Sequence, residues 1–208
     1  MRERTGIFLL LILYGVGIVS LMVNDLRNVV LPLSPYTLLL SFLILMNSYR
    51  WKSPVVWVAV LVFLLGFTAE WVGVQKGWLF GVYHYGSNLG PKLAGVPLII
   101  GINWAMLTLA TGAAAASMLK NRWAIILVAA LLMTGLDYVM EPVAVENGYW
   151  YWKDGKIPLY NYVCWFLVAL LYQGYVAQLN VLKILILFLW NLYSNWLFSF
   201  SKFYFLFG

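Results

Sequence analysis

Long apolar runs alternate with polar connections along the whole chain. A helix needs about 20 apolar residues to cross the hydrocarbon core of a bilayer, and most of the runs are close to that length. At these lengths a helix is the structure that satisfies all of its own backbone hydrogen bonds inside the core. The pattern predicts an all-α fold, a polytopic transmembrane helix bundle with six to seven spans. The predicted spans cover residues 7–23, 33–49, 54–74, 95–118, 123–143, 161–179 and 183–206.

The last of these runs differs from the others in its polar and aromatic content. It contains Trp190, Asn191, Asn195 and Lys202. Aromatic and polar side chains of this kind are common where a membrane meets water. The run at 183–206 therefore either crosses the membrane or lies along its interface.

Composition agrees with a single membrane domain. Of the 208 residues, 64% are hydrophobic and 10% are charged, and the mean hydropathy is +0.88. A soluble domain needs far more charge on its exterior. Because the apolar runs continue along the whole chain, we expect residues 1–208 to form one integral membrane domain. Cys164 is the only cysteine, so no intrachain disulfide is expected.

Basic residues are spread over the connections at both ends of the predicted bundle, with a slight excess at the end that carries the N-terminus. By the positive-inside rule this excess predicts a cytoplasmic N-terminus in the cell membrane. The net charge of +6 fits a membrane protein with basic loops. No basic stretch is dense enough to follow a phosphate backbone, so no nucleic-acid partner is expected.

Acidic residues are sorted to one end of the predicted bundle. All of them except Glu3 fall at the end opposite to the N-terminus. Glu70, Asp137 and Glu141 lie within apolar runs or at their ends, where an ionisable group usually faces the bundle interior or a wet cavity. Asp137 and Glu141 are four residues apart and so share one helical face. In the alternative interpretation each acid only forms a structural ion pair, with Lys76, Lys92 or Lys153.

The same end of the bundle carries the two long connections, residues 77–98 and 146–165. They are rich in glycine and aromatic residues, and they contain His84, the only histidine, together with Asn88 and Asn161. Connections at the other end are short. Such an asymmetry is typical of a binding site at one membrane interface, although an ordinary interfacial belt would account for some of the aromatic residues. We expect residues 77–98 to form a lid and wall of that site.

The residues that are missing restrict the chemistry. One histidine cannot build a multi-histidine iron cluster or a zinc site with three histidines. The chain has no glycine-rich dinucleotide motif and no phosphate-binding loop. No metal and no cofactor are therefore expected. Carboxylates, one imidazole, amides and aromatic rings remain, and this set suits cofactor-free acid–base chemistry on an apolar substrate.

Two blocks resemble the signature of the CruF-type carotenoid hydratases, which include bisanhydrobacterioruberin hydratases and lycopene or γ-carotene 1,2-hydratases. The first block, "EWVGVQKGWLFGVYHYGSNLGPKLAGVPLIIGINW", covers residues 70–104. The second, "DYVMEPVAVENGYWYWKDGKIPLYNYVCW", covers residues 137–165. That family often has Asp-Pro where this chain has Glu141-Pro142, so the carboxylate is kept but reaches one methylene further. The matching positions are Glu70, Phe80, Gly81, Tyr83, Tyr85, Leu89, Gly90, Pro91, Leu93, Gly95, Pro97, Trp104, Asp137, Glu141, Pro142, Gly148, Trp150, Trp152, Pro158, Asn161 and Trp165.

The resemblance implies that water adds across the terminal C1–C2 double bond of an acyclic carotenoid end group and gives a tertiary alcohol. A carboxylic acid would protonate C2, and burial beside a second carboxylate favours the protonated form that this step needs. The expected catalytic residues are Asp137, Glu141, Glu70 and His84. Aromatic faces would stabilise the cation at C1. The expected substrate-binding residues are Tyr83, Tyr85, Asn88, Trp104, Trp150, Trp152, Asn161 and Trp165.

The implied partners are water, the lipid bilayer and a carotenoid of the lycopene, γ-carotene or C50 bisanhydrobacterioruberin type, together with other carotenoid-pathway enzymes. Two points stay open in the sequence. In one interpretation His84 or Asn88 holds the reacting water. In the other, His84 is only an interfacial residue bonded to a loop carbonyl. The chain could also bind or transport a carotenoid without catalysis. A retinal photoreceptor is disfavoured because Lys202 lies near the end of the last run, and a general transporter because no inverted repeat is visible.

Overall fold

A computed structural model describes residues 3–178 of the chain, so the predicted span 183–206 lies outside the described residues. The elements are α1 (Glu3–Leu21), α2 (Asn24–Val30), the 3-10 helix η1 (Leu31–Leu33), α3 (Ser34–Ser48), α4 (Ser53–Lys76), β1 (Tyr83–Tyr85), β2 (Lys92–Leu93), β3 (Val96–Pro97), α5 (Leu98–Met118), α6 (Arg122–Glu146), β4 (Trp150–Trp152) and α7 (Leu159–Gln178). The predicted helical membrane bundle is confirmed. The four short strands in its long connections were not predicted.

Four helical stretches among residues 3–178 are long and apolar enough to cross a membrane. They are Asp25–Ser48, which joins α2, η1 and α3, and the helices α4, α5 and α6. The apolar part of α1, Phe8–Leu21, is shorter, and α7 is not among the four. Six to seven spans therefore stays a prediction.

The first of these stretches, Asp25–Ser48, differs from the sequence prediction at its start. We expected a span to begin at residue 33, but the helical path already begins at Asp25. Pro32 and Pro35 do not interrupt it, because each occupies the first turn of a helical segment. Proline costs no hydrogen bond in a first turn, since the N–H groups there have no partner within the helix.

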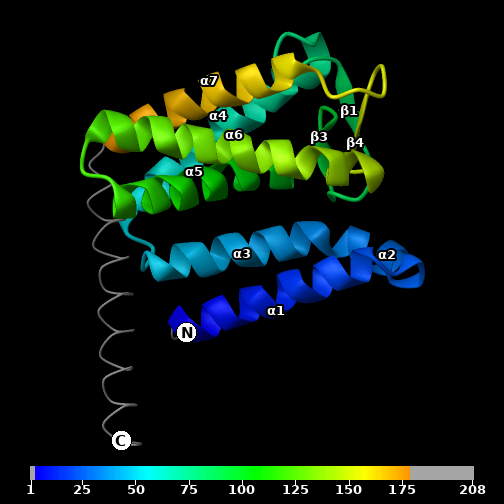
Figure 1. The fold of residues 1–208 in the computed structure, drawn as a ribbon, viewed down its shortest axis with the longest axis horizontal. Helices are drawn as coiled ribbons and strands as arrows, with labels where there is room; N and C mark the ends of the chain where they lie inside the picture. Colours follow the sequence, from blue (N-terminus) through cyan, green and yellow to red (C-terminus); the bar gives the residue numbers. More distant parts are fainter. Residues whose placement is uncertain (1–2, 179–208) are drawn as a thin grey trace, which may run out of the picture.

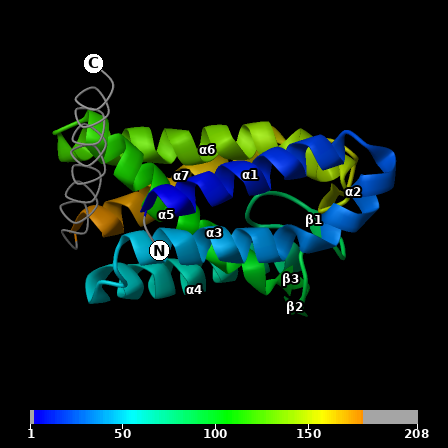
Figure 2. The same cartoon turned by 90° about the horizontal axis from the view of Figure 1, so that it is seen from below.

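The long helices run roughly along one common direction and form two layers (Figure 1). Helices α4 to α7 make up the larger layer, in which α4 packs on α5, α5 on α6 and α6 on α7. The second layer contains α1 and α3, and α3 packs against α5. Figure 2 shows the same molecule from below, and in both views the strands gather with α2 at one end of the bundle. This is the end to which the sequence assigns the acidic residues.

Close packing of α4 on α5 depends on two glycines. A Cβ atom added at Gly66 would lie 2.6 Å from Cβ of Trp104, and one added at Gly101 would lie 2.7 Å from the ring of Phe63. Small residues let membrane helices approach each other in this way. The contact seats Trp104 in a fully buried position, which matters for the site described below.

A second set of contacts ties α7 to α5 inside the bundle. The side-chain amide of Gln173 donates hydrogen bonds of 3.0 Å to the backbone oxygen of Thr108 and to Oγ1 of Thr111. Hydrogen bonds between spans help to fix how membrane helices pack. Together with the α4–α5 contact, they hold the inner faces of three helices in a defined register.

Gly66→Ala should destabilise the protein. The added methyl group must displace Trp104, and overpacking of this kind typically costs about 1–3 kcal/mol. Thermal unfolding in detergent measures the effect. Gly135→Ala is the matched control, because an added Cβ in α6 meets no atom within 4 Å and should leave the midpoint unchanged or raise it slightly. Equal midpoints for the two variants would contradict this view of the α4–α5 contact.

Candidate active site

Strands β1 and β4 bring the two long connections together. They pair antiparallel, with Tyr83 opposite Trp152 and Tyr85 opposite Trp150. Because side chains alternate along a strand, these four residues lie on one face of the ribbon. That face is turned toward the ends of α4 and α6. Of the predicted lid, residues 77–98, Tyr83–Tyr85 thus forms one strand of a two-stranded ribbon, and the other strand comes from the second connection.

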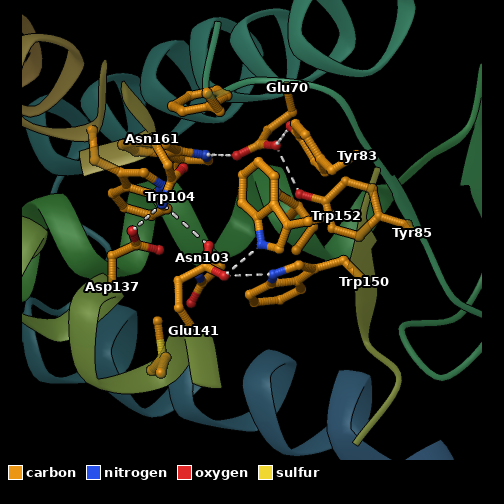
Figure 3. Close-up of a pocket in the computed structure, with 14 residues that line it drawn as sticks. Glu70, Tyr83, Tyr85, Asn103, Trp104, Asp137, Glu141, Trp150, Trp152 and Asn161 are labelled. Atoms are coloured by element: carbon orange, nitrogen blue, oxygen red, sulfur yellow. Dashed lines mark hydrogen bonds between the residues drawn. The ribbon is translucent and has the colours of Figure 1, made fainter. Parts of the chain in front are cut away.

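A cavity lies beneath this ribbon, and its lining is shown in Figure 3. Its volume is about 40 Å³, which exceeds the roughly 10–15 Å³ that a single water molecule needs. All three carboxyl groups that the sequence singled out line it. The full lining is Glu70, Phe80, Tyr83, Tyr85, Ile100, Asn103, Trp104, Asp137, Met140, Glu141, Trp150, Trp152, Asn161 and Trp165.

The carboxyl group of Glu70 accepts three hydrogen bonds. Tyr83 and Tyr85 donate their hydroxyl protons to Oε2 over 2.5 and 2.7 Å. The indole N–H of Trp104 donates to Oε1 over 2.9 Å. Glu70 is almost fully buried, so these donors replace the water that would otherwise solvate the group.

The two tyrosines are suited to remain donors. Burial, followed by the negative charge of Glu70, raises the pKa of both the Tyr83 and the Tyr85 hydroxyl well above the usual value. Both hydroxyls therefore keep their protons at neutral pH. The glycine at position 73 leaves room for Tyr83, since an added Cβ there would lie 2.8 Å from the Tyr83 hydroxyl oxygen.

Glu141 has a comparable set of donors. The indole N–H groups of Trp150 and Trp152 donate to its Oε2 over 2.9 and 3.0 Å. The side-chain amide of Asn161 donates to its Oε1 over 3.2 Å. Ribbon and helices thus hold Glu141 jointly, because two of its donors come from β4 and the third from α7.

Asp137 lies one helical turn before Glu141 and has fewer donors. The amide of Asn161 donates to its Oδ2 over 2.9 Å, so one amide bridges both carboxyl groups of α6. No residue in the described part of the chain donates a hydrogen bond to Oδ1 of Asp137. Of the three acids, Asp137 alone has an oxygen that no donor occupies.

Aromatic rings form the apolar part of the wall. The rings of Trp104 and Trp165 stack with centroids 3.9 Å apart. Phe80 packs against both of them and against Tyr83. The faces of such rings carry partial negative charge and attract a cation. Buried carboxyl groups and aromatic faces therefore surround the same small space.

Two predicted site residues do not line the cavity. His84 sits between Tyr83 and Tyr85, so the alternation of the strand turns its side chain to the opposite face. There its ring is exposed and stacks on Tyr151, with centroids 5.2 Å apart. Asn88 lies beyond the strand, and its amide reaches the backbone oxygen of Asn147 over 3.5 Å.

Ion pairing of the three acids with lysines is also not observed. Among residues 3–178 the one ion pair joins Arg27 and Glu146 over 3.0 Å. Lys92 instead donates to the backbone oxygen of Tyr85 over 2.7 Å. Neutral N–H and O–H donors, rather than cations, compensate the buried carboxyl groups.

Asn103 is a lining residue that the sequence analysis missed, along with the apolar Ile100 and Met140. It lies near the start of α5, directly before Trp104. A polar side chain within an apolar run is the same signal that identified Glu70, and it would have pointed to Asn103 as well.

Comparison with known proteins identifies the family. A family model described as "carotenoid biosynthesis protein" matches residues 12–191. The chain belongs to this family. With its apolar helices, it is an integral membrane protein of carotenoid biosynthesis. A curated relative from Haloarcula japonica, named bisanhydrobacterioruberin hydratase, is 33% identical over 116 residues. That alignment covers 52% of this chain and 40% of the relative. No solved structure matches the chain.

Glu141→Gln should lower stability more than Glu70→Gln. The glutamine amide adds N–H groups that need acceptors. Two of the three groups bonded to Glu141 are indole N–H groups, which cannot accept, and an unsatisfied buried donor costs about 1–3 kcal/mol. Around Glu70 the hydroxyls of Tyr83 and Tyr85 can turn and accept.

Thermal unfolding of the two variants in the same detergent measures this difference, and each variant is the control for the other. An unfolding midpoint of Glu70→Gln at or below that of Glu141→Gln would contradict the assignment of donors.

Proposed function

We propose that this protein is a carotenoid 1,2-hydratase. It adds water across the terminal C1–C2 double bond of an acyclic carotenoid end group and gives a tertiary alcohol. Membership of the carotenoid biosynthesis family and the name of the Haloarcula japonica relative support a hydration reaction. The observation that carries the proposal is the aromatic-lined cavity in which three carboxyl groups meet and one of them, Asp137, has an oxygen without a donor.

Asp137 is the proton donor in this proposal. Hydrogen bonds donated to a carboxylate stabilise its charged form. Glu70 and Glu141 each accept three such bonds and are therefore the carboxylates. Asp137 accepts only one hydrogen bond and lies next to the negative charge of Glu141. If the three acids share one proton, Oδ1 of Asp137 is therefore where it is held best. That proton passes to C2, the less substituted carbon of the double bond.

The walls of the cavity then stabilise the cation. Protonation at C2 leaves the positive charge on the tertiary carbon C1. The carboxylates Glu70 and Glu141 attract this charge, and the faces of Trp104 and Trp165 add a weaker attraction of about 0.5–2 kcal/mol per ring. Water attacks C1, and its proton passes to a carboxylate of the cavity. The three acids then hold one proton again, and the reaction consumes no cofactor.

The position of the cavity suits a long apolar substrate. A C40 polyene is about as long as the hydrocarbon core is thick, roughly 30 Å. With most of the polyene among lipid and helices, its end reaches the cavity at one end of the bundle, where water is available. The proposed substrates are lycopene, γ-carotene or a C50 bisanhydrobacterioruberin-type carotenoid, and the partners are other enzymes of the pathway. The proposal includes six to seven spans in the cell membrane with a cytoplasmic N-terminus.

Membranes that contain the protein should convert lycopene or γ-carotene to a product heavier by one water per end group. The added oxygen is expected to carry the label of heavy-oxygen water, because water is the nucleophile. Mass spectrometry of extracted pigments measures both. The reaction should continue under anaerobic conditions and in a chelator. Label that arrives from molecular oxygen would indicate a monooxygenase and contradict the proposal.

Asp137→Asn should reduce hydration at least about 100-fold, because the amide keeps the shape of the side chain but has no proton to give. Asp154→Asn is the matched control, since Asp154 is exposed in the connection after β4 and should leave the rate unchanged. Near-normal hydration by folded Asp137→Asn would show that another group donates the proton.

A further inference from the structure

Asn103 differs from every other polar residue of the cavity in having no partner. Its side chain makes no hydrogen bond with any residue in the described part of the chain, and it is half-buried against the cavity at the start of α5 (Figure 3). The other polar side chains of the lining have their N–H or O–H groups committed to an acid. Those donors belong to Tyr83, Tyr85, Trp104, Trp150, Trp152 and Asn161.

A water molecule in the cavity therefore finds few groups that are free to bind it. The amide of Asn103 offers both a free acceptor and free donors. The second free group is Oδ1 of Asp137, from which a proton is donated. The cavity volume of about 40 Å³ exceeds the roughly 10–15 Å³ that one water molecule needs. His84 and Asn88, which the sequence suggested for this task, lie outside the lining.

We infer that Asn103 holds the water that attacks C1. This inference rests on the proposed hydratase function and assigns the water-binding role that the proposal leaves open. The carbonyl oxygen of Asn103 accepts a hydrogen bond from the water, and the water's lone pair is left free to form the C1–O bond. A proton of the water passes to a carboxylate of the cavity as that bond forms.

Removal of the amide should change the product rather than stop the first step. Asp137 can still protonate C2, because its proton does not depend on Asn103. The cation at C1 then has no positioned nucleophile and must lose a proton instead. Loss from C2 restores the starting alkene, and loss from a methyl group on C1 gives an isomer with a terminal CH2 group. In heavy water both products carry deuterium.

Asn103→Leu in heavy water is the test, with lycopene as substrate and the pigments examined by mass spectrometry and deuterium NMR. We expect hydration to fall at least about 100-fold, as for other losses of positioning. Recovered carotenoid should contain deuterium at C2 or be the terminal-CH2 isomer. Asn47→Leu is the matched control, since Asn47 is exposed near the end of α3 and does not line the cavity, and it should hydrate lycopene like the unaltered protein.

Three other outcomes have separate meanings. Normal hydration by Asn103→Leu would overturn the inference. Loss of both hydration and deuterium uptake in a folded variant would also overturn it, because Asn103 would then act at the protonation step. Failure of the unaltered protein to hydrate any of the proposed carotenoids would contradict the proposed function itself. If Asn103→Leu does not fold, Asn103→Val removes the amide without added volume and carries the same test.

Discussion

The structure depends on how three carboxyl groups are compensated inside an apolar bundle. A charged carboxylate buried without partners would cost far more free energy than a fold of this size can supply. Here the compensation comes from neutral donors: phenol groups on β1, indole groups on β4 and α5, and one amide on α7. The ribbon of β1 and β4 is therefore more than a cover. Its inward side chains solvate the acids, and the acids in turn fix the ribbon to the ends of the helices.

The same donors make the three acids unequal. Two carboxyl groups have three donors each, while Asp137 shares a single amide with its neighbour Glu141. Catalysis by proton transfer requires one group that holds a proton and another that can take one, and like-charged neighbours with different surroundings supply such a pair. In this protein the difference arises from the indole and phenol groups above the acids. The same rings leave a small and largely apolar space, which suits the apolar end group of the proposed substrate.

Parts of this arrangement could be predicted from the sequence. Apolar runs predict spans because lipid leaves the backbone no other partner, and the acids within those runs were expected to meet, as Glu70, Asp137 and Glu141 do. The alternative interpretation, in which lysines pair with the three acids, was wrong. The pattern of polar and apolar residues cannot show whether cations or neutral donors compensate a buried acid. The position of His84 was missed because the strand Tyr83–Tyr85 was not recognised within a connection. Asn103 was missed because an uncharged amide costs less to bury than an ionisable group and is therefore a weaker signal within an apolar run. Pairing of β1 with β4 joins segments distant in sequence, and no local signal specifies it.

Infrared spectroscopy of the protein in membranes tests most directly whether the distribution of donors decides which acid holds the proton. At neutral pH a protonated carboxylic acid has a C=O stretching band that is separate from the carboxylate bands. We expect one such band from the buried acids, absent in Asp137→Asn and present in both Glu70→Gln and Glu141→Gln. A band that persists in Asp137→Asn and disappears in either glutamine variant would contradict this expectation, because the proton would then reside on a carboxyl group with three donors.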